Sequence, residues 1–246
     1  MYRATVTAIT PRSFRQGQIL LFAVLTSLSI AVSALYAQAT DGSSAPLIKS
    51  HGISTFGDLK YPADFEHLDY VNPDAPKGGE ISIWGFGGFD SMNPYTPKGR
   101  AGRLSNIFFE SLLTGTADEI GSSYGLIAES LEYPEDRSFV IFNLRDDVTF
   151  SDGSSLTAED VVFSYELFLE KGLPSFRAVL SQQVETAELL GPLRVKYTFK
   201  EGFPTRDLPE TVGGLPIFSK AHYEANDRDF EESSLEPLLG SGPYVL

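Results

Sequence analysis

Residues 150–166, FSDGSSLTAEDVVFSYE, constrain the fold of this 246-residue chain more than any other segment. Asp152 and Gly153 form a turn dipeptide directly after an apolar run, so the chain should reverse direction there. Thr157 stands three residues before Asp160, which is the spacing of a capping box at a helix N-terminus. Apolar residues then recur at helical spacing: Val161, Val162, Tyr165, Phe168 and Leu169. The segment therefore predicts a strand, a turn and a capped helix.

Other elements have weaker or shorter signals. The helix should end at Lys171-Gly172, because Pro174 cannot continue it. Residues 193–200 alternate apolar and polar side chains after a Gly-Pro pair, which predicts the clearest strand of the chain. A core helix is expected within residues 104–113, where apolar side chains share one helical face. Shorter strands are expected over residues 81–84, 140–144 and 148–150.

The N-terminus has the features of a secretory signal peptide. Three arginines precede an apolar run over residues 19–35, and Ala-Gln-Ala at residues 37–39 fits a cleavage site with small residues. The alternative is an uncleaved membrane anchor, but the run is short and is diluted by serine and threonine. We therefore expect residues 1–39 to be a signal peptide and residues 40–50 to form a polar linker.

The sequence contains no cysteine, and its formal net charge is −14. Without cysteine, the chain can form no disulfide framework and can carry no lipid on a cysteine after the apolar run. So acidic a surface argues against nucleic acid and anionic membranes as partners. We therefore expect a soluble, exported protein in a periplasm, without a lipid anchor.

Two patterns invite an enzymatic interpretation. GSSYG at residues 121–125 matches the G-x-S-x-G pattern of a nucleophile elbow, in which Ser122 or Ser123 would be the nucleophile. The preceding residues 114–119 are polar and turn-like rather than a buried strand, so we interpret the segment as a surface loop. The glycine-rich turn at residues 85–88 lacks the helix that a dinucleotide site needs, because Pro94 follows too closely. An exported serine hydrolase remains an alternative function.

The titratable residues show no catalytic or metal-binding arrangement. His51, His67 and His222 are not at metal-ligand spacing. Asp146 and Asp147 lie next to each other near a turn, where a solvated pair is expected. The sequence therefore predicts no catalytic residue, no metal site and no cofactor.

Several motifs resemble those of the bacterial extracellular solute-binding proteins of family 5, the dipeptide-, oligopeptide- and nickel-binding receptors of ABC importers. The signature of that family is matched by Phe150, Asp152, Gly153, Thr157, Ala158, Asp160, Val161, Phe163 and Ser164. Further matches are Met92-Asn93-Pro94, Ala128-Glu129-Ser130, Phe142, Leu144, Arg145 and Gly240-Ser241-Gly242-Pro243-Tyr244. Residues 60–81 are similar to the entry segment of the YejA-type branch, which is linked to oligopeptides and microcin C.

The resemblance implies an α/β fold of the periplasmic binding protein type, type 2 with an extra inserted subdomain. Residues 51–103 and 191–246 would then belong to lobe I, and residues 104–190 would be the inserted subdomain. Complete family members continue into a second lobe and then finish the first. The resemblance therefore implies an N-terminal fragment that lacks the second lobe and the closing strands.

The function implied is the periplasmic substrate-binding component of an ABC importer, which captures oligopeptides or peptide-like compounds and delivers them to the permease in the inner membrane. Such a receptor is not an enzyme and is a monomer when complete. A nickel- or haem-binding receptor of the same fold is a second alternative, although histidine is scarce and cysteine is absent.

The resemblance also implies which residues line the cleft. A receptor for mixed peptides needs main-chain partners from an extended edge, which β-augmentation provides. Arg100 or Lys98 could meet a ligand carboxylate or phosphate, and Phe176 is either a cleft aromatic or a packing residue. The expected ligand-binding residues are Thr96, Pro97, Lys98, Gly99, Arg100, Ala101, Gly102 and Phe176.

Overall fold

The helix predicted after the Asp152-Gly153 turn is present in the computed structural model, which describes residues 46–80, 82–226 and 229–245. This helix, α2, spans Ala158–Lys171. The buried carboxylate of Asp160 accepts hydrogen bonds from the amide (2.8 Å) and the hydroxyl (3.0 Å) of Thr157. Pro174 begins the next helix, α3, Pro174–Gln183, as a proline at the first helical position. The capped helix and its end are therefore confirmed.

The strands in the described part of the chain form two antiparallel sheets. The larger sheet has the order β1-β5-β6-β8-β7. Its strands are β1 Ile48–Ser50, β5 Ala128–Tyr133, β6 Phe139–Leu144, β7 Val184–Gly191 and β8 Arg194–Phe199. Across the sheet centre, Phe142 faces Val195 and Val140 faces Tyr197, and all four side chains are buried. The strands predicted over residues 193–200 and 140–144 are thus confirmed as β8 and β6.

The smaller sheet has the order β2-β4-β3. Its strands are β2 Gly52–Ser54, β3 Leu113–Gly115 and β4 Ser122–Gly125. The last four residues of the GSSYG sequence therefore form the central strand of this sheet, with Ser122 and Ser123 buried. The expected surface loop is wrong, because pairing with both β2 and β3 places these short polar residues inside.

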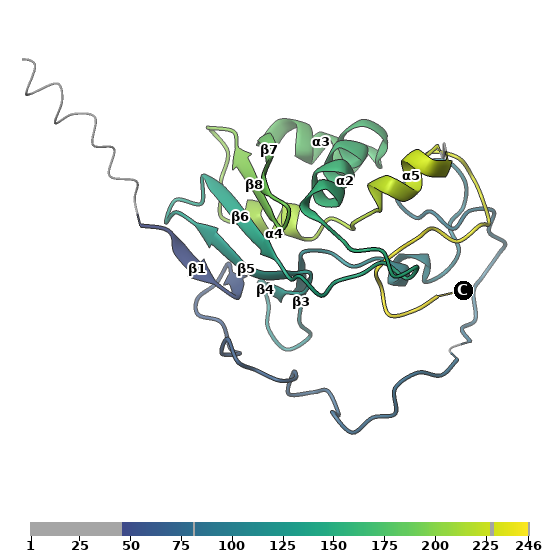
Figure 1. Cartoon of the computed structure of the whole chain (residues 1–246), viewed down its shortest axis with the longest axis horizontal. Helices are drawn as coiled ribbons and strands as arrows, with labels where there is room; N and C mark the ends of the chain where they lie inside the picture. The colour runs from purple at the N-terminus through teal and green to yellow at the C-terminus, as the bar shows by residue number, and fades with distance from the viewer. Residues whose placement is uncertain (1–45, 81, 227–228, 246) are drawn as a thin grey trace, which may run out of the picture. The chain divides into compact units, whose positions relative to one another are not determined.

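Helices α2, α3 and α4 (Leu208–Gly213) pack against the larger sheet (Figure 1). Helices α2 and α3 contact β7, and α4 contacts β3 and β8. Helix α5, Lys220–Asn226, contacts α2. The rings of Phe168 and Phe218 lie 5.7 Å apart in the core between these elements. None of the described helices is long and apolar enough to cross a membrane.

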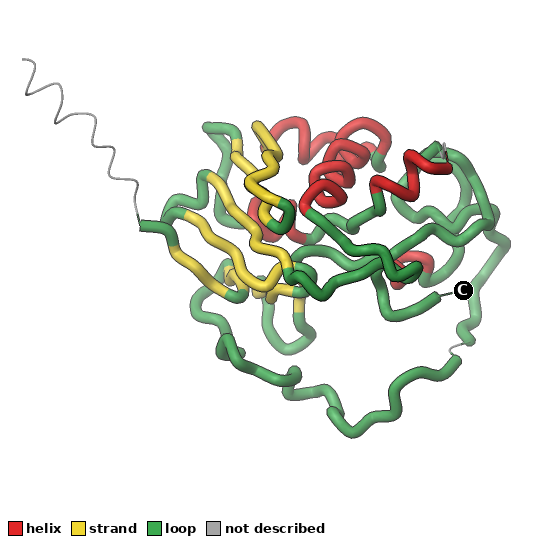
Figure 2. The backbone as a smooth tube through the Cα atoms, in the orientation of Figure 1, coloured by secondary structure: helices red, strands yellow, loops and turns green. Residues whose placement is uncertain are grey.

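Between β2 and a 3-10 helix at Ser105–Phe108 lies a long segment whose described residues form no helix or strand, as the loop trace in Figure 2 shows. Its first part is held on the β3–β4 connection by Lys60, whose Nζ pairs with Asp118 (2.5 Å) and Asp69 (2.7 Å). The hydroxyl of Tyr61 also donates a hydrogen bond to Asp118. The later part, residues 82–90, is exposed and leads to the candidate site.

Three expected elements are absent from the described residues. The core helix within residues 104–113 is wrong: only Ser105–Phe108 form a 3-10 helix, because Leu104 is left-handed (φ 62°) and Phe109 is extended. Residues 82–84 form no strand, since no described strand pairs with them. Residues 148–150 contribute only a single bridge from Thr149 to Ser155.

The described residues cover only part of the expected domain boundaries. The signal peptide at residues 1–39 and linker residues 40–45 lie outside the described residues. The prediction of a linker is wrong for residues 48–50, which form β1 because they hydrogen-bond to β5. The larger sheet combines β8, from the expected lobe I, with β5 and β6, from the expected inserted subdomain. The division into lobe and subdomain stays a prediction.

Candidate functional site

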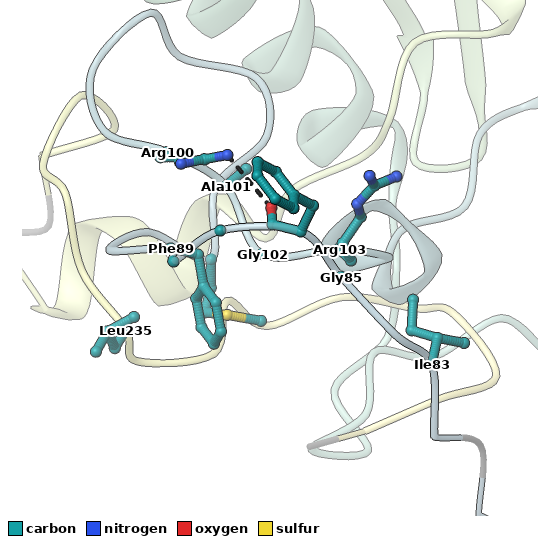
Figure 3. A pocket seen from close by; sticks show the side chains of 12 residues that line it. Ile83, Gly85, Phe89, Arg100, Ala101, Gly102, Arg103 and Leu235 are labelled. Atoms are coloured by element: carbon teal, nitrogen blue, oxygen red, sulfur yellow. Dashed lines mark hydrogen bonds between the residues drawn. The ribbon is translucent and has the colours of Figure 1, made fainter.

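A pocket of about 620 Å³ lies between residues 83–92 and residues 100–103. Figure 3 shows that its lining combines glycines, aromatic rings and two arginines. The lining residues are Ile83, Gly85, Phe86, Gly87, Gly88, Phe89, Met92, Arg100, Ala101, Gly102, Arg103 and Leu235. A pocket with apolar walls and a few polar groups is the usual form of a small-molecule site.

The two segments pair in parallel at Ser91 and Ala101. The amide of Ser91 donates to the carbonyl of Arg100 (3.3 Å), and the amide of Gly102 donates to the carbonyl of Ser91 (2.8 Å). In such a ladder the main-chain groups of Ala101 point away from Ser91. Among the described residues, the N–H and C=O of Ala101 form no hydrogen bond. The segment therefore presents a free strand edge at the pocket.

The turn that follows Ser91 is anchored to the core. The side-chain amide of Asn93 donates to the carbonyl of Phe230 (2.8 Å), and its oxygen accepts the amide of Tyr95 (2.9 Å). The ring of Tyr95 packs edge-on against Phe168 and Phe218, at centroid distances of 5.6 and 5.8 Å. Burial raises the pKa of Tyr95 to about 12. These contacts hold the turn next to the pocket residue Met92 against the core.

Arg100 is positioned by the glycine-rich turn. Its Nη2 donates a hydrogen bond to the carbonyl of Phe86 (3.3 Å), drawn as the dashed line in Figure 3. Gly87 is left-handed (φ +83°), and a Cβ atom there would lie 2.6 Å from Nη2 of Arg100. Only glycine therefore allows the guanidinium to lie against this turn. No carboxylate of the described residues pairs with Arg100 or Arg103.

The apolar walls of the pocket are open. Phe86 is 74% exposed and Phe89 is 56% exposed, and Ile83 and Leu235 are similarly accessible. Large apolar side chains gathered at the surface mark sites of interaction. Together with the two arginines, they suit a ligand that has both apolar and anionic parts.

The structure brings only some of the expected ligand-binding residues together. Arg100, Ala101 and Gly102 line the pocket. Thr96, Pro97, Lys98 and Gly99 precede it: Thr96 is buried, its hydroxyl accepts the amide of Lys98, and Nζ of Lys98 pairs with Glu231 at 3.3 Å. The binding roles of all these residues stay predictions.

Phe176 lies away from these residues, in α3. Its ring packs 5.1 Å from that of Phe168, and it lines a separate apolar pocket of about 210 Å³ with Val179 and Leu180. Phe176 therefore has a packing contact, and its role in ligand binding also stays a prediction.

Sequence reasoning missed Phe86, Phe89, Arg103 and Leu235 as lining residues. The alternation of glycine and phenylalanine at residues 85–89 was a usable signal, since large apolar residues in a turn have no local packing partner. Leu235 had no such signal, because only the folded chain brings it to the pocket. It lies near because the amide of Met92 donates to the carbonyl of Ser234 (2.8 Å).

The alternative enzymatic site is not assembled in the described part of the chain. The hydroxyl of Ser123 donates to Glu210 (2.6 Å), and that of Ser122 donates to Ser54 (3.0 Å). Neither serine hydrogen-bonds to a described histidine, so the pair that activates a serine nucleophile is not formed there. Within residues 46–80, 82–226 and 229–245, no group of three or more His, Cys, Asp or Glu could hold a metal ion.

The sequence matches a family model described as bacterial extracellular solute-binding proteins, family 5 Middle, over residues 123–246. Among curated proteins it is 39% identical to the probable peptide-binding protein YejA of Agrobacterium fabrum over 224 residues, 89% of this chain and 36% of the relative. It is also 39% identical to the peptidoglycan-binding protein YepA of the same organism over 205 residues, 80% of this chain and 33% of the relative. The chain thus spans about a third of the length of these relatives.

Two solved structures share the fold. One is a periplasmic oligopeptide-binding protein of an ABC transporter from Thermotoga maritima (TM-score 0.51, 23% identity). The match covers 63% of this chain and 28% of the Thermotoga chain. The other is the periplasmic binding protein DppA from Helicobacter pylori in complex with the peptide STSA (TM-score 0.51, 20% identity). This match covers 63% of this chain and 34% of the DppA chain. The α/β fold expected from the sequence is therefore that of periplasmic binding proteins.

Proposed function

Because this chain belongs to the bacterial extracellular solute-binding proteins of family 5, we propose that it forms part of a receptor that captures oligopeptides or peptide-like compounds in the periplasm and delivers them to an ABC permease. Members of this family and the structural neighbours are binding proteins and not enzymes. The names of two relatives, a probable peptide-binding protein and a peptidoglycan-binding protein, support a peptide-type ligand.

The observation that carries the proposal is the free main-chain edge at Ala101, directly beside the pocket. A peptide laid along this edge would accept from the N–H of Ala101 and donate to its C=O, as an added strand does. Such bonds involve only the peptide backbone of the ligand. They therefore suit a receptor that accepts peptides of different sequence.

The exposed rings of Phe86 and Phe89 support a mechanism in which the pocket closes. A ligand bound to the open pocket would keep one side in water. Closure of a second lobe over the ligand would exclude that water and strengthen the hydrogen bonds, and solute receptors close in this way about hinges. The permease would then recognise the closed form.

The proposal is tested by calorimetry of the complete receptor with a mixed tripeptide and tetrapeptide library. The mixture should bind, and mass spectrometry of the washed complex should identify peptides. The variant Ala101→Pro, which removes the N–H donor of this residue and also restricts its backbone, should bind at least about tenfold more weakly, since one hydrogen bond in a desolvated site is worth about 1.4 kcal/mol.

A ligand-side control covers the possibility that Ala101→Pro perturbs the fold. Peptides N-methylated at one bond at a time should show one position at which methylation abolishes binding, because one peptide N–H would face the carbonyl of Ala101. A library that does not bind at all would overturn the proposed function. Uniform tolerance of methylation would refute the edge at Ala101.

A further inference from the structure

We propose that the pocket selects ligands with two acidic groups at one end, such as a peptide whose last residue also has an acidic side chain, and that Arg100 and Arg103 bind these two groups. This inference rests on the proposed function and specifies its ligand class. The lining of the pocket contains two arginines and no aspartate or glutamate. The chain as a whole has 33 acidic and 19 basic residues, so this local excess of positive charge runs against the overall composition.

Arg100 is held so that most of its donors remain available. A guanidinium has five N–H donors, and the hydrogen bond to the carbonyl of Phe86 uses one of them. The nearby Asp90 forms no ion pair with this guanidinium; its Oδ1 instead accepts a hydrogen bond from the main-chain amide of Arg100. Arg100 can therefore bind a carboxylate with two parallel hydrogen bonds.

Arg103 supplies a second and separate cation. Its side chain passes over Gly85, where a Cβ atom would lie 3.1 Å from Cγ of Arg103. The guanidinium forms no hydrogen bond or ion pair with any described residue. In Figure 3 the side chains of Arg100 and Arg103 stand apart from each other. They are thus placed to bind two anionic groups rather than to share one.

The same lining disfavours other ligand ends. A free amino group would find no carboxylate among the lining residues and would be repelled by both guanidiniums. A neutral side chain would leave one guanidinium without a counter-charge. Closure over the exposed rings of Phe86 and Phe89 would exclude water from the site, so each charge-assisted hydrogen bond should then be stronger than at an open surface.

The test uses isothermal titration calorimetry of the complete receptor with four tripeptides that differ only in carboxylate number. These are alanyl-alanyl-glutamate (two), alanyl-alanyl-glutamine (one), and the C-terminal amides of each (one and none). We expect alanyl-alanyl-glutamate to bind about tenfold more tightly than either peptide with one carboxylate, which corresponds to about 1.4 kcal/mol.

Protein variants connect this preference to the two arginines. Arg103→Gln and Arg100→Gln should each remove most of the preference for glutamate over glutamine. Arg145→Gln makes the same charge change in an exposed residue whose ion pair in the described part of the chain is with Asp147, and it should keep the preference. Melting curves of all variants would show whether they fold.

A glycine pair tests the positioning of Arg100 without changing any charge. Gly87→Ala would push its Cβ atom into the guanidinium and should weaken the preference. Gly202→Ala is the matched control, because Gly202 has the same left-handed backbone (φ +88°) but no atom within 4 Å of the place that a Cβ would take. Both substitutions place alanine at a positive φ, but only the Cβ of Gly87→Ala would contact Arg100, so only this variant should affect ligand selection.

The outcomes separate this inference from the proposed function. Equal affinities for all four peptides would overturn the inference and leave peptide binding in place. A preference for glutamate that survives both Arg100→Gln and Arg103→Gln would also overturn it. If no tripeptide binds and the library does not bind either, the proposed function fails together with the inference.

Discussion

Replacing Asp160 with alanine should lower the free energy of unfolding by about 3 kcal/mol, because this one carboxylate joins the starts of two helices. Asp160 is only 6% exposed. Its Oδ2 accepts the amide and hydroxyl of Thr157 at the start of α2, and its Oδ1 accepts the amide of Lys220 at the start of α5 (2.9 Å). Shortening this buried side chain would leave these donors without their acceptor.

The magnitude follows from the groups that lose their acceptor. Two main-chain amides, those of Thr157 and Lys220, would each lose a hydrogen bond to a charged group, at about 1.5 kcal/mol apiece, the lower end of the usual range because both bonds are only partly buried. The negative charge near the N-terminus of α2 also interacts favourably with the helix dipole, by about 0.5 kcal/mol. For a chain of this size the loss corresponds to a fall of about 6–12 °C in Tm.

Urea denaturation followed by circular dichroism would measure the change. Asp160→Asn keeps one acceptor oxygen, so its free energy of unfolding should lie between those of the parent and of Asp160→Ala. Asp147→Ala is the control. The exposed carboxylate of Asp147 pairs weakly with Arg145 (3.4 Å), so its removal should change the free energy of unfolding by less than about 0.5 kcal/mol. A loss below about 1 kcal/mol for Asp160→Ala would refute the reasoning that these bonds hold α2 and α5 together.

Three further predictions concern burial and pH. Val161→Asp places a charge in a core position that is 2% exposed, so it should cost more than about 4 kcal/mol or prevent folding, as expression and melting curves would show. Hydrogen bonds from Lys60 hold the pKa of Asp118 below its ordinary value, so this stabilisation is present above about pH 4. It should be lost on further acidification, and the urea midpoint of Asp118→Asn should fall less between pH 5 and pH 2 than that of the parent. Burial instead raises the pKa of Glu110, so its ionised form is unfavourable in the folded state. Glu110→Gln should therefore raise Tm at pH 7 and should have no such effect at pH 4. An equal shift of Tm at both pH values would contradict this assignment.

The sequence by itself determined those elements whose hydrogen bonds close within a few residues. Thr157 and Asp160 are three residues apart, so the start of α2 could be recognised without any knowledge of the fold. Pro174 ended that helix for a covalent reason, since proline has no N–H to donate. The alternation in residues 193–200 predicted β8 because one face of that strand is buried in any sheet it joins.

Only the tertiary structure decided which strands pair and which distant residues meet. Residues 122–125 of the GSSYG sequence became a central strand because β2, from a distant part of the chain, pairs with it on the side opposite its sequence neighbour β3. Residues 104–113 have a helical pattern but form a 3-10 turn and the start of β3, because Phe108, Phe109, Leu112 and Leu113 are buried by other elements instead. Of the candidate site, residues 100–102 could be expected from a resemblance, whereas Arg103 and Leu235 could not. Residues far apart in sequence come into contact only when all the helices and strands pack together, and no local sequence pattern specifies that packing.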